Sequence, residues 1–269
     1  MLYRTTATPL DDIEFIARSK HRISALEALS ERPQSRDELS AVTGASPSTI
    51  GRMLREFEDR HWIRRNEHQY EATELGAFVT AGITELVDRI ETGQKLSDVW
   101  QWLPIEAMGF TIEMASDAVV TVAESDSPYG PVNRFASLLR EAEEFRFVGF
   151  DVALLEPCRD ELRRRIVDGM QTEIIDPPSV AKYILSTYGE HCAESLESDD
   201  FSVLLHDELP PYGVSLFDRR IAISGYNPDS GTVQVLIDTD AKAAREWAEA
   251  TFESYRDEAR ALSLEQVVE

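Results

Sequence analysis

Residues 44–57 constrain the fold of this 269-residue chain more than any other stretch. Gly44 supplies a tight turn, Ser46 can cap the helix that follows, and Pro47 occupies the first helical position, where proline is tolerated. Apolar side chains then recur on one helical face, at Ile50, Met53, Leu54 and Phe57. This spacing predicts a helix that begins after Ser46 and buries its apolar face.

The residues before this helix predict further helices. Residues 11–30 have helical apolar spacing, and a short helix is expected to begin after Ser35, because Glu38 follows at the capping-box spacing. That helix ends near Gly44. Two helices joined by a glycine turn, the second beginning after Ser46, have the order of a helix-turn-helix.

The residues after this helix predict a small β-hairpin. Residues 62–65 and 69–72 are two short strand-like segments, and residues 66–68 form the tip between them. A hairpin at this place is the wing of a winged helix-turn-helix. We therefore expect residues 1–78 to form a winged helix-turn-helix domain.

The helix that begins after Ser46 is polar and basic on the face opposite its apolar stripe. A recognition helix of this kind enters the major groove of DNA, about 12 Å wide, with its N-terminal residues facing base edges. Arginine grips guanine with two hydrogen bonds, serine and threonine bond phosphates or bases, and a wing adds contacts to phosphates or the minor groove. The predicted DNA-binding residues are Ser46, Ser48, Thr49, Arg52, Arg55, Arg64, Arg65 and His68. The alternative is a winged-helix protein-interaction module that senses no small molecule.

Charge is distributed unevenly along the chain. The formal net charge is −23, from 50 acidic and 27 basic residues, and only four of the basic residues are lysines. A surface rich in carboxylates and poor in lysine is typical of halophilic proteins. Acidic charge argues against nucleic acid, but residues 1–80 carry 11 basic and 13 acidic side chains, whereas residues 81–269 carry 16 and 37. Two modules with different partners are therefore expected.

A long amphipathic helix is predicted over residues 74–100, after a cap at Thr73. This helix is a connector, a dimer helix, or both. The expected domains are the winged helix-turn-helix (residues 1–78), a helical connector (residues 79–103) and an α/β domain for effector sensing, dimerisation or both (residues 104–269).

The second part of the chain predicts an α/β sheet. Strand-like runs at 118–123, 145–150, 172–176 and 201–205 alternate with helices at 131–143, 155–169 and 178–197. This alternation is typical of parallel strands. Three further strands joined by short turns predict antiparallel hairpins, and a last amphipathic helix follows; these segments are 212–218, 219–225, 232–238 and 240–262. The fold class that we predict is α/β with more than one domain.

Several segments resemble known archaeal transcription regulators. They are "RSKHRISALEAL", "ASPSTIGRMLREFEDRHWIRR", "ATELG", "PPYGVSLFDRRIAISGYNPDSG" and "AREWAEATFESYRDEA". Residues 11–78 resemble the winged-helix domain of such regulators, and residues 104–262 resemble the C-terminal domain of a haloarchaeal group named for a methanogenesis regulator. The second domain is also similar to the effector domain of archaeal sugar-responsive regulators, whose sheet resembles that of phospholipase D. The resemblance implies a DNA-binding regulator.

An enzymatic function is not expected. The catalytic His-x-Lys pair of the phospholipase D fold is absent, because neither His191 nor His206 has a lysine two residues on. No G-x-S-x-G, P-loop or G-x-G-x-x-G motif occurs, and the five histidines are scattered. We therefore predict no catalytic residue, no metal site and no cofactor.

The composition also predicts where the protein works. Its two cysteines, Cys158 and Cys192, make neither a metal set nor a disulfide framework, which fits a reducing cytoplasm. No apolar run reaches the roughly 18 residues that a membrane helix needs, and residues 1–10 contain no apolar stretch of a secretory signal. A cytoplasmic protein without a membrane partner is expected.

Polar residues at strand ends predict a small-molecule site in the second domain. Ligands of open α/β sheets lie beyond the carboxyl ends of the strands, and the residues expected there are Asp151, Asp176, Tyr212 and Asp218. Each also has a structural interpretation, the aspartates as helix caps and Tyr212 as the edge of the core. The sequence as a whole predicts a homodimeric regulator that binds double-stranded DNA and responds to an effector.

Overall fold

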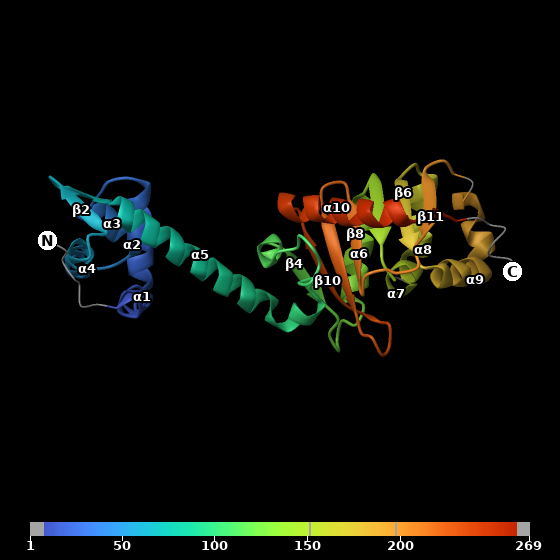
Figure 1. Cartoon of the computed structure of the whole chain (residues 1–269), viewed down its shortest axis with the longest axis horizontal. Coiled ribbons are helices and arrows are strands. Elements are labelled where there is room, and N and C mark those ends of the chain that lie inside the picture. The colour runs from blue at the N-terminus through green and yellow to red at the C-terminus, as the bar shows by residue number, and fades with distance from the viewer. Residues whose placement is uncertain (1–7, 151, 197, 263–269) are drawn as a thin grey trace. The chain divides into compact units, whose positions relative to one another are not determined.

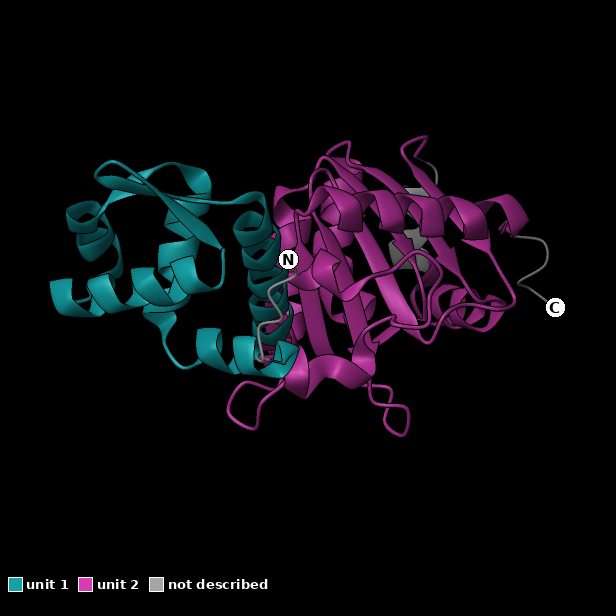
Figure 2. Ribbon diagram, turned by 60° about the vertical axis from the view of Figure 1, so that its left-hand side comes forward, with its two compact units in different colours: residues 1–91 teal, residues 92–269 magenta. Residues whose placement is uncertain are grey.

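The computed structural model describes residues 8–150, 152–196 and 198–262, with residues 190–196 described by their backbone alone. The chain forms two compact units, residues 1–91 and residues 92–269 (Figures 1 and 2). Helices and strands are mixed, with a helical first unit and a large sheet in the second. The predicted α/β class is therefore confirmed.

Unit 1 contains four short helices and a three-stranded sheet. The helices are α1 (Pro9–Ala17), α2 (Lys20–Glu31), α3 (Arg36–Thr43) and α4 (Pro47–Asp59). The strands are β1 (Gln34–Ser35), β2 (Ile63–Asn66) and β3 (Gln69–Ala72), which pair antiparallel in the order β1-β3-β2. This is the order of elements that the sequence predicts for a helix-turn-helix followed by a wing.

The single helix predicted over residues 11–30 is two helices, α1 and α2. Ser19 interrupts them with an extended backbone, at φ −156° and ψ 120°. The break lets Phe15 on α1 pack against α4 and the wing, with its ring centroid 6.0 Å from that of Phe57 and 6.1 Å from that of Trp62. Tertiary packing, which the local pattern does not encode, thus decided where the helix ends.

The predicted helix caps around α3 and α4 are confirmed. The Glu38 N–H donates to the Ser35 hydroxyl (3.3 Å) and the Ser35 N–H donates to the Glu38 carboxylate (2.7 Å), which completes the capping box. These bonds, with help from Arg32, lower the pKa of Glu38 to about 2. Gly44 ends α3 in the left-handed region, at φ 70°. The apolar stripe of α4 is buried, as predicted.

The long helix α5 (Glu74–Leu96) follows the wing and contains the division between the two units. The Thr73 hydroxyl accepts the N–H of Gly76 at 3.0 Å, as expected of a cap. A side chain at Gly76 would be impossible without movement, because its Cβ would lie 1.8 Å from the Trp62 carbonyl oxygen. The sequence placed the end of this helix at residue 100, but a 3₁₀ helix, η1 (Ser97–Trp102), follows Leu96.

Unit 2 is built on an eight-stranded sheet of order β11-β7-β6-β5-β8-β9-β10-β4. Its strands are β4 (Val119–Val122), β5 (Glu144–Val148), β6 (Gln171–Asp176), β7 (Phe201–Leu205), β8 (Tyr212–Phe217), β9 (Ile221–Tyr226), β10 (Val233–Thr239) and β11 (Arg260–Ala261). Strands β5, β6 and β7 are parallel, and the predicted hairpins β8–β9–β10 are antiparallel.

One strand lies elsewhere than predicted. The alternation of strands and helices placed residues 118–123 among the parallel strands, but β4 pairs antiparallel with β10 at the edge of the sheet. The hairpin strands, which come later in the chain, insert between β4 and β5. A local pattern does not reveal such an insertion, because it depends on which distant strands pair.

Helices cover both faces of this sheet. One face carries α6 (Gly130–Glu141), α7 (Val152–Leu155), the 3₁₀ helix η3 (Glu156–Cys158), α8 (Arg159–Val167) and α9 (Pro178–Leu196). The other face carries α10 (Lys242–Glu258), which runs across the sheet in Figure 1, together with η1 and the 3₁₀ helix η2 (Ile112–Ala115). Each layer buries its own apolar core against the sheet, around Phe135 on the first face and Phe252 on the second.

A buried carboxylate joins the first layer to the sheet. Asp238 on β10 has no exposed side-chain surface and accepts two bonds from Arg134 of α6, at 2.9 and 2.7 Å. Arg220 donates a further bond to it at 2.9 Å. The bidentate bond raises the pKa of the Arg134 guanidinium above its ordinary value.

Among the described helices, none is both long enough and apolar enough to cross a membrane.

Candidate nucleic-acid interface

The N-terminus of α4 presents three hydroxyl groups. The Ser46 hydroxyl accepts the N–H of Thr49 at 3.3 Å, so Ser46 is the predicted cap. The hydroxyls of Ser48 and Thr49 lie 3.0 and 2.9 Å from the same oxygen. The first turn of a helix has N–H groups without intrahelical partners and the positive end of the helix dipole. This end of α4 therefore suits an anionic oxygen, as a phosphate has.

Arg52 and Arg55 point outward from α4, opposite its buried stripe. Both are exposed, and in the described part of the chain neither guanidinium has a hydrogen bond or ion pair. Arg60, one turn further on, is used within the fold: its Nε lies 2.9 Å from the Asp12 carboxylate and its guanidinium lies 3.8 Å from the Phe15 ring centroid. The two positive charges of Arg52 and Arg55 are therefore available to a partner.

The acidic residues of α4 are partly neutralised within unit 1. Arg22 of α2 pairs with Glu56 at 3.2 Å, and the Arg22 side chain is only 13% exposed. Glu58 and Asp59 lie near the C-terminal end of α4, away from the three hydroxyl groups. The half of the helix that bears the hydroxyl groups and Arg52 thus contains no carboxylate.

The wing presents one of its two arginines more freely than the other. Arg64 and Glu71 are directly opposite in the β2–β3 register and form an ion pair at 2.7 Å. Arg65 donates to the backbone oxygen of Glu67 at 2.9 Å. His68 is exposed at the tip, where Glu67 adopts a positive φ of 53°. Sequence reasoning did not identify Glu71 as the partner of Arg64, although the two residues lie opposite each other in the hairpin.

Arg36, the first residue of α3, is a basic side chain that sequence reasoning missed. Its guanidinium donates to the Tyr70 hydroxyl at 3.0 Å. The guanidinium carbon of Arg36 lies 5.8 Å from the centroid of the Tyr70 ring, and that of Arg65 lies 5.9 Å from it. Tyr70 therefore brings an arginine of α3 and an arginine of the wing to one place. No local pattern signals this pairing, because 34 residues separate Arg36 from Tyr70.

The three predicted effector-site residues that the structure describes, Asp176, Tyr212 and Asp218, lie at three different places. Asp151 lies outside the described residues. Asp176 is buried at the end of β6, on the face covered by α9. Tyr212 begins β8 and faces α10, near Trp247 on the opposite face of the sheet. Asp218 follows β8 and accepts the backbone N–H groups of Glu143 and Glu144, at 3.1 and 2.8 Å.

Strand direction explains this separation. Strand β8 runs antiparallel to β5, so Asp218, which follows β8, lies beside the beginning of β5. The carboxyl ends of the parallel strands are at the other end of the strands. The prediction that Asp218 lies with Asp176 is therefore wrong in position, and Asp218 caps backbone N–H groups instead. Among the described residues, no three histidine, cysteine, aspartate or glutamate side chains gather to hold a metal ion.

Two family models match the chain. Residues 128–258 match the model described as "Methanogenesis regulatory protein FilR1, middle domain", and residues 10–95 match the "HVO_A0261 N-terminal domain". No curated protein matches. The first match supports a transcription-regulator family, and it covers the elements of unit 2 from α6 to α10, which include strands β5 to β10.

The chain is also similar to several solved structures. TrmBL2, an archaeal chromatin protein, is 12% identical, with a TM-score of 0.43 over 95% of this chain and 100% of that one. NucT from Helicobacter pylori is 14% identical, with a TM-score of 0.44 over 54% of this chain and 99% of that one. An IclR family transcriptional regulator from Brucella abortus is 11% identical, with a TM-score of 0.24 over 93% of this chain and 96% of that one. All three TM-scores lie below 0.5.

Proposed function

We propose that this protein is a sequence-specific DNA-binding transcription regulator that acts in the cytoplasm as a homodimer under the control of a small-molecule effector. The observation that carries the DNA-binding part is the outward pair Arg52 and Arg55 on α4, which no acidic side chain among the described residues neutralises. The family match to a regulatory protein supports the same function.

In the proposed complex, α4 lies in the major groove. Ser46, Ser48 and Thr49 meet a phosphate at the N-terminus of the helix, where the dipole favours negative charge. Arg52 and Arg55 bond base edges, for which each good bidentate contact with guanine supplies about 1–3 kcal/mol of discrimination. Arg65 and His68 of the wing meet the neighbouring backbone, and Arg64 contributes less because Glu71 partly neutralises it.

The charge of the whole chain suggests how this binding works in salt. With a net charge of −23, the protein suits a halophilic cytoplasm. At 1 M salt the Debye length is about 3 Å, so long-range attraction to DNA is weak and counterion release drives binding less. Direct contacts and the simultaneous binding of two half-sites by a dimer then supply the affinity.

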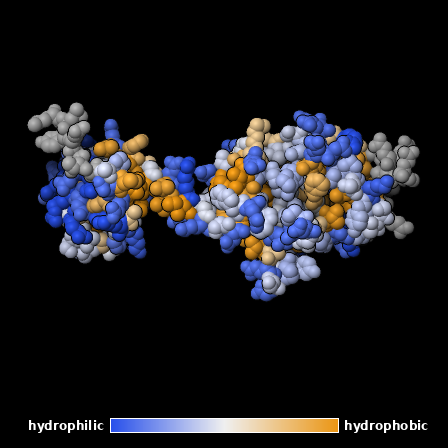
Figure 3. All heavy atoms as spheres, turned by 60° about the horizontal axis from the view of Figure 1, so that its bottom comes forward, coloured by the Kyte–Doolittle hydropathy of each residue, from blue (hydrophilic) through white to orange (hydrophobic). Residues whose placement is uncertain are grey.

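The helix α5 is the proposed dimer element. Leu75, Phe78, Leu86 and Ile90 are exposed on it, and Phe78 is 78% exposed. Figure 3 shows hydrophobic surface gathered on this helix. A contiguous exposed apolar patch on a protein of this kind marks a surface that another molecule covers. An effector that changes the placement of two winged domains would then alter their match to two half-sites.

The test is a double substitution, Arg52→Ala with Arg55→Ala, in a genome-wide map of where the protein binds its own chromosome. The control, Arg140→Ala with Arg256→Ala, removes two exposed arginines from unit 2 and so changes the net charge equally. We expect sharp peaks that share a palindromic motif for the wild type and the control, and their loss in the Arg52/Arg55 variant with folding intact. Peaks that persist in that variant, or no peaks in any condition, would exclude the proposed interface.

A further inference from the structure

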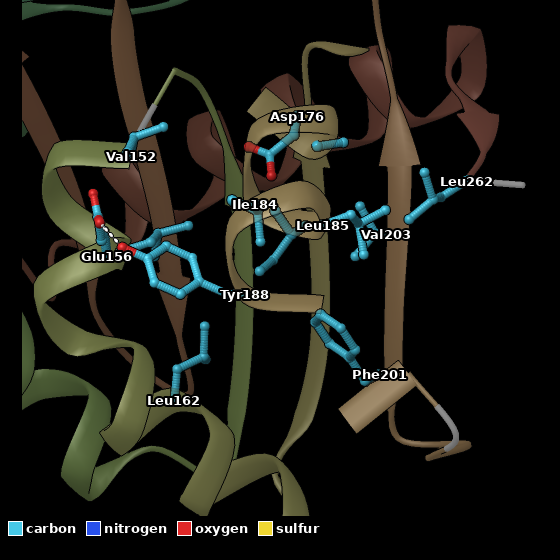
Figure 4. A pocket seen from close by; sticks show the side chains of 13 residues that line it. Val152, Glu156, Leu162, Asp176, Ile184, Leu185, Tyr188, Phe201, Val203 and Leu262 are labelled. Atoms are coloured by element: carbon cyan, nitrogen blue, oxygen red, sulfur yellow. Dashed lines mark hydrogen bonds between the residues drawn. The ribbon is translucent and has the colours of Figure 1, made fainter. Parts of the chain in front are cut away.

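An apolar cavity lies in unit 2 between the sheet and the helices α7, α8 and α9. Its volume is about 100 Å³, and its lining includes Ile184 and Ala181 of α9 and Phe201 of β7 (Figure 4). The lining residues are mostly aliphatic or aromatic, and no lysine, arginine or histidine is among those that the structure describes. The cavity is separate from the winged domain and lies wholly within unit 2.

One carboxyl oxygen of this cavity is buried and has no partner among the described residues. Asp176, the last residue of β6, is 3% exposed, and within the described part of the chain its Oδ1 atom has no hydrogen bond. Figure 4 shows its carboxyl group near Val152 and Ile184. Buried polar atoms in native proteins nearly always have a partner, because leaving one unpaired costs about 1–3 kcal/mol. Among the residues that the structure describes, none donates a hydrogen bond to this oxygen of Asp176.

The other polar side chains of the cavity are already engaged with each other. The Tyr188 hydroxyl donates to the Glu156 carboxylate, which raises the pKa of Tyr188 to about 12. This bond leaves the cavity with carboxylate acceptors and no spare donor among its described lining residues. A water molecule in the cavity would have the unpartnered Oδ1 of Asp176 and the already bonded Glu156 carboxylate as its side-chain partners. Buried water usually makes about three hydrogen bonds.

We propose that this cavity is the effector site and that it binds a small aliphatic amine, whose ammonium group donates to Asp176 and whose alkyl chain packs against Ile184, Ala181 and Phe201. The role of the amine as an effector rests on the proposed function, whereas amine binding in the cavity does not depend on DNA binding.

Charge selects an amine over other small molecules. A carboxylate ligand would bring a second negative charge beside Asp176 in a low-dielectric site, which is costly. Residues 81–269 hold 37 acidic against 16 basic side chains, so the field of this part of the chain attracts cations. Burial raises the pKa of Asp176 to about 7, so part of the carboxyl groups hold a proton at neutral pH. An entering ammonium group stabilises the charged carboxylate, and the carboxyl proton is released to solvent as the ion pair forms.

Volume limits the size of the amine. An engineered cavity of about 150 Å³ in another protein admits benzene, which has six non-hydrogen atoms. A cavity of about 100 Å³ therefore suits roughly four or five such atoms. Isobutylamine, with a branched chain and one ammonium group, has that size.

The test titrates the full-length protein with isobutylamine, isobutanol and isobutyrate, and follows the methyl NMR signals of Ile184 and Ile174, which both line the cavity. We expect saturable shifts with isobutylamine, and affinity at least tenfold weaker, about 1.4 kcal/mol, for isobutyrate. Asp176→Asn should weaken amine binding at least tenfold, because the amide keeps the shape and removes the charge. Asp229→Asn is the matched control, since it removes one exposed carboxylate from the β9–β10 turn.

A second variant tests the cavity without changing charge. Ala181→Leu fills the space beside Asp176, and we expect it to abolish amine binding. Equal binding of isobutyrate and isobutylamine, unchanged amine binding in Asp176→Asn, or no saturable shift of the wild type would each overturn the proposal. Amine binding by a protein whose Arg52/Arg55 variant still occupies the chromosome would instead uphold the cavity and overturn the DNA interface.

Discussion

The buried carboxyl of Asp176 should make the stability of unit 2 fall as the pH rises. Burial raises its pKa from the ordinary value of 3.8 to about 7. The folded state therefore binds this proton more tightly than the unfolded state does. The stabilisation is complete below about pH 4 and is lost as the pH rises through about 7.

The magnitude follows from the shift. Each pKa unit corresponds to about 1.4 kcal/mol. The full loss is therefore roughly 4 kcal/mol above pH 8, and roughly 2–3 kcal/mol of it falls between pH 5 and pH 8. The other titratable side chains of the cavity, Glu156 and Tyr188, face it from η3 and α9 and are bonded to each other. They are unchanged in Asp176→Asn, so a comparison with that variant isolates Asp176.

The assay is urea unfolding of the wild type and of Asp176→Asn at pH 5, 6, 7 and 8 at constant salt. Tryptophan fluorescence reports on unit 2 through Trp100, Trp102 and Trp247. We expect the free energy of unfolding of the wild type, relative to the variant, to fall by roughly 2–3 kcal/mol between pH 5 and pH 8. A difference that stays constant across this range would refute the reasoning, because it would mean that Asp176 has an ordinary pKa.

Four further predictions concern the fold and the proposed dimer. Asp238→Ala should lower the free energy of unfolding by about 3 kcal/mol, measured by urea unfolding, because it leaves Arg134 and Arg220 without their buried partner; a loss below about 1 kcal/mol would show that the pair is solvated. Gly76→Ala should destabilise unit 1 by roughly 1–3 kcal/mol, because its Cβ would meet the Trp62 carbonyl. By contrast, Gly82→Ala on the same helix meets nothing within 4 Å and should raise the melting temperature through a gain of roughly 0.5–1 kcal/mol; equal effects at the two sites would contradict the packing argument. Leu86→Glu with Ile90→Glu should halve the mass measured by light scattering, and an unchanged mass would exclude α5 as the dimer element.

Local structure in unit 1 was predictable because its determinants lie within a few residues of one another. The capping box of Ser35 and Glu38, the turn at Gly44 and the cap at Ser46 each depend on contacts over three or four positions. The outward position of Arg52 and Arg55 follows from helical periodicity in the same way. These residues therefore could be assigned to the candidate interface from the sequence.

The charge environment of that interface was less predictable. Nothing in the order of residues shows that Arg60 is taken up by Asp12, 48 positions away, while Arg52 and Arg55 stay unpaired. The same holds for Arg36, which Tyr70 brings to the wing. Whether an arginine can contact a partner molecule depends on which distant side chains pack against it. The composition gives only the number of arginines, not which of them are paired.

The sequence by itself determined the caps of α3 and α4, the wing that follows α4 and the face of α4 that stays exposed, because hydrogen bonds and helical spacing act within a few residues. Only the tertiary structure decided where the strands lie and which side chains meet. The late hairpin strands inserted between β4 and β5. The antiparallel direction of β8 placed Asp218 at the strand ends opposite to those where Asp176 lies, and Tyr212 and Asp176 are on opposite faces of the sheet. Burial of Asp176 in an apolar cavity is likewise a property of packed helices, and no local rule contains it.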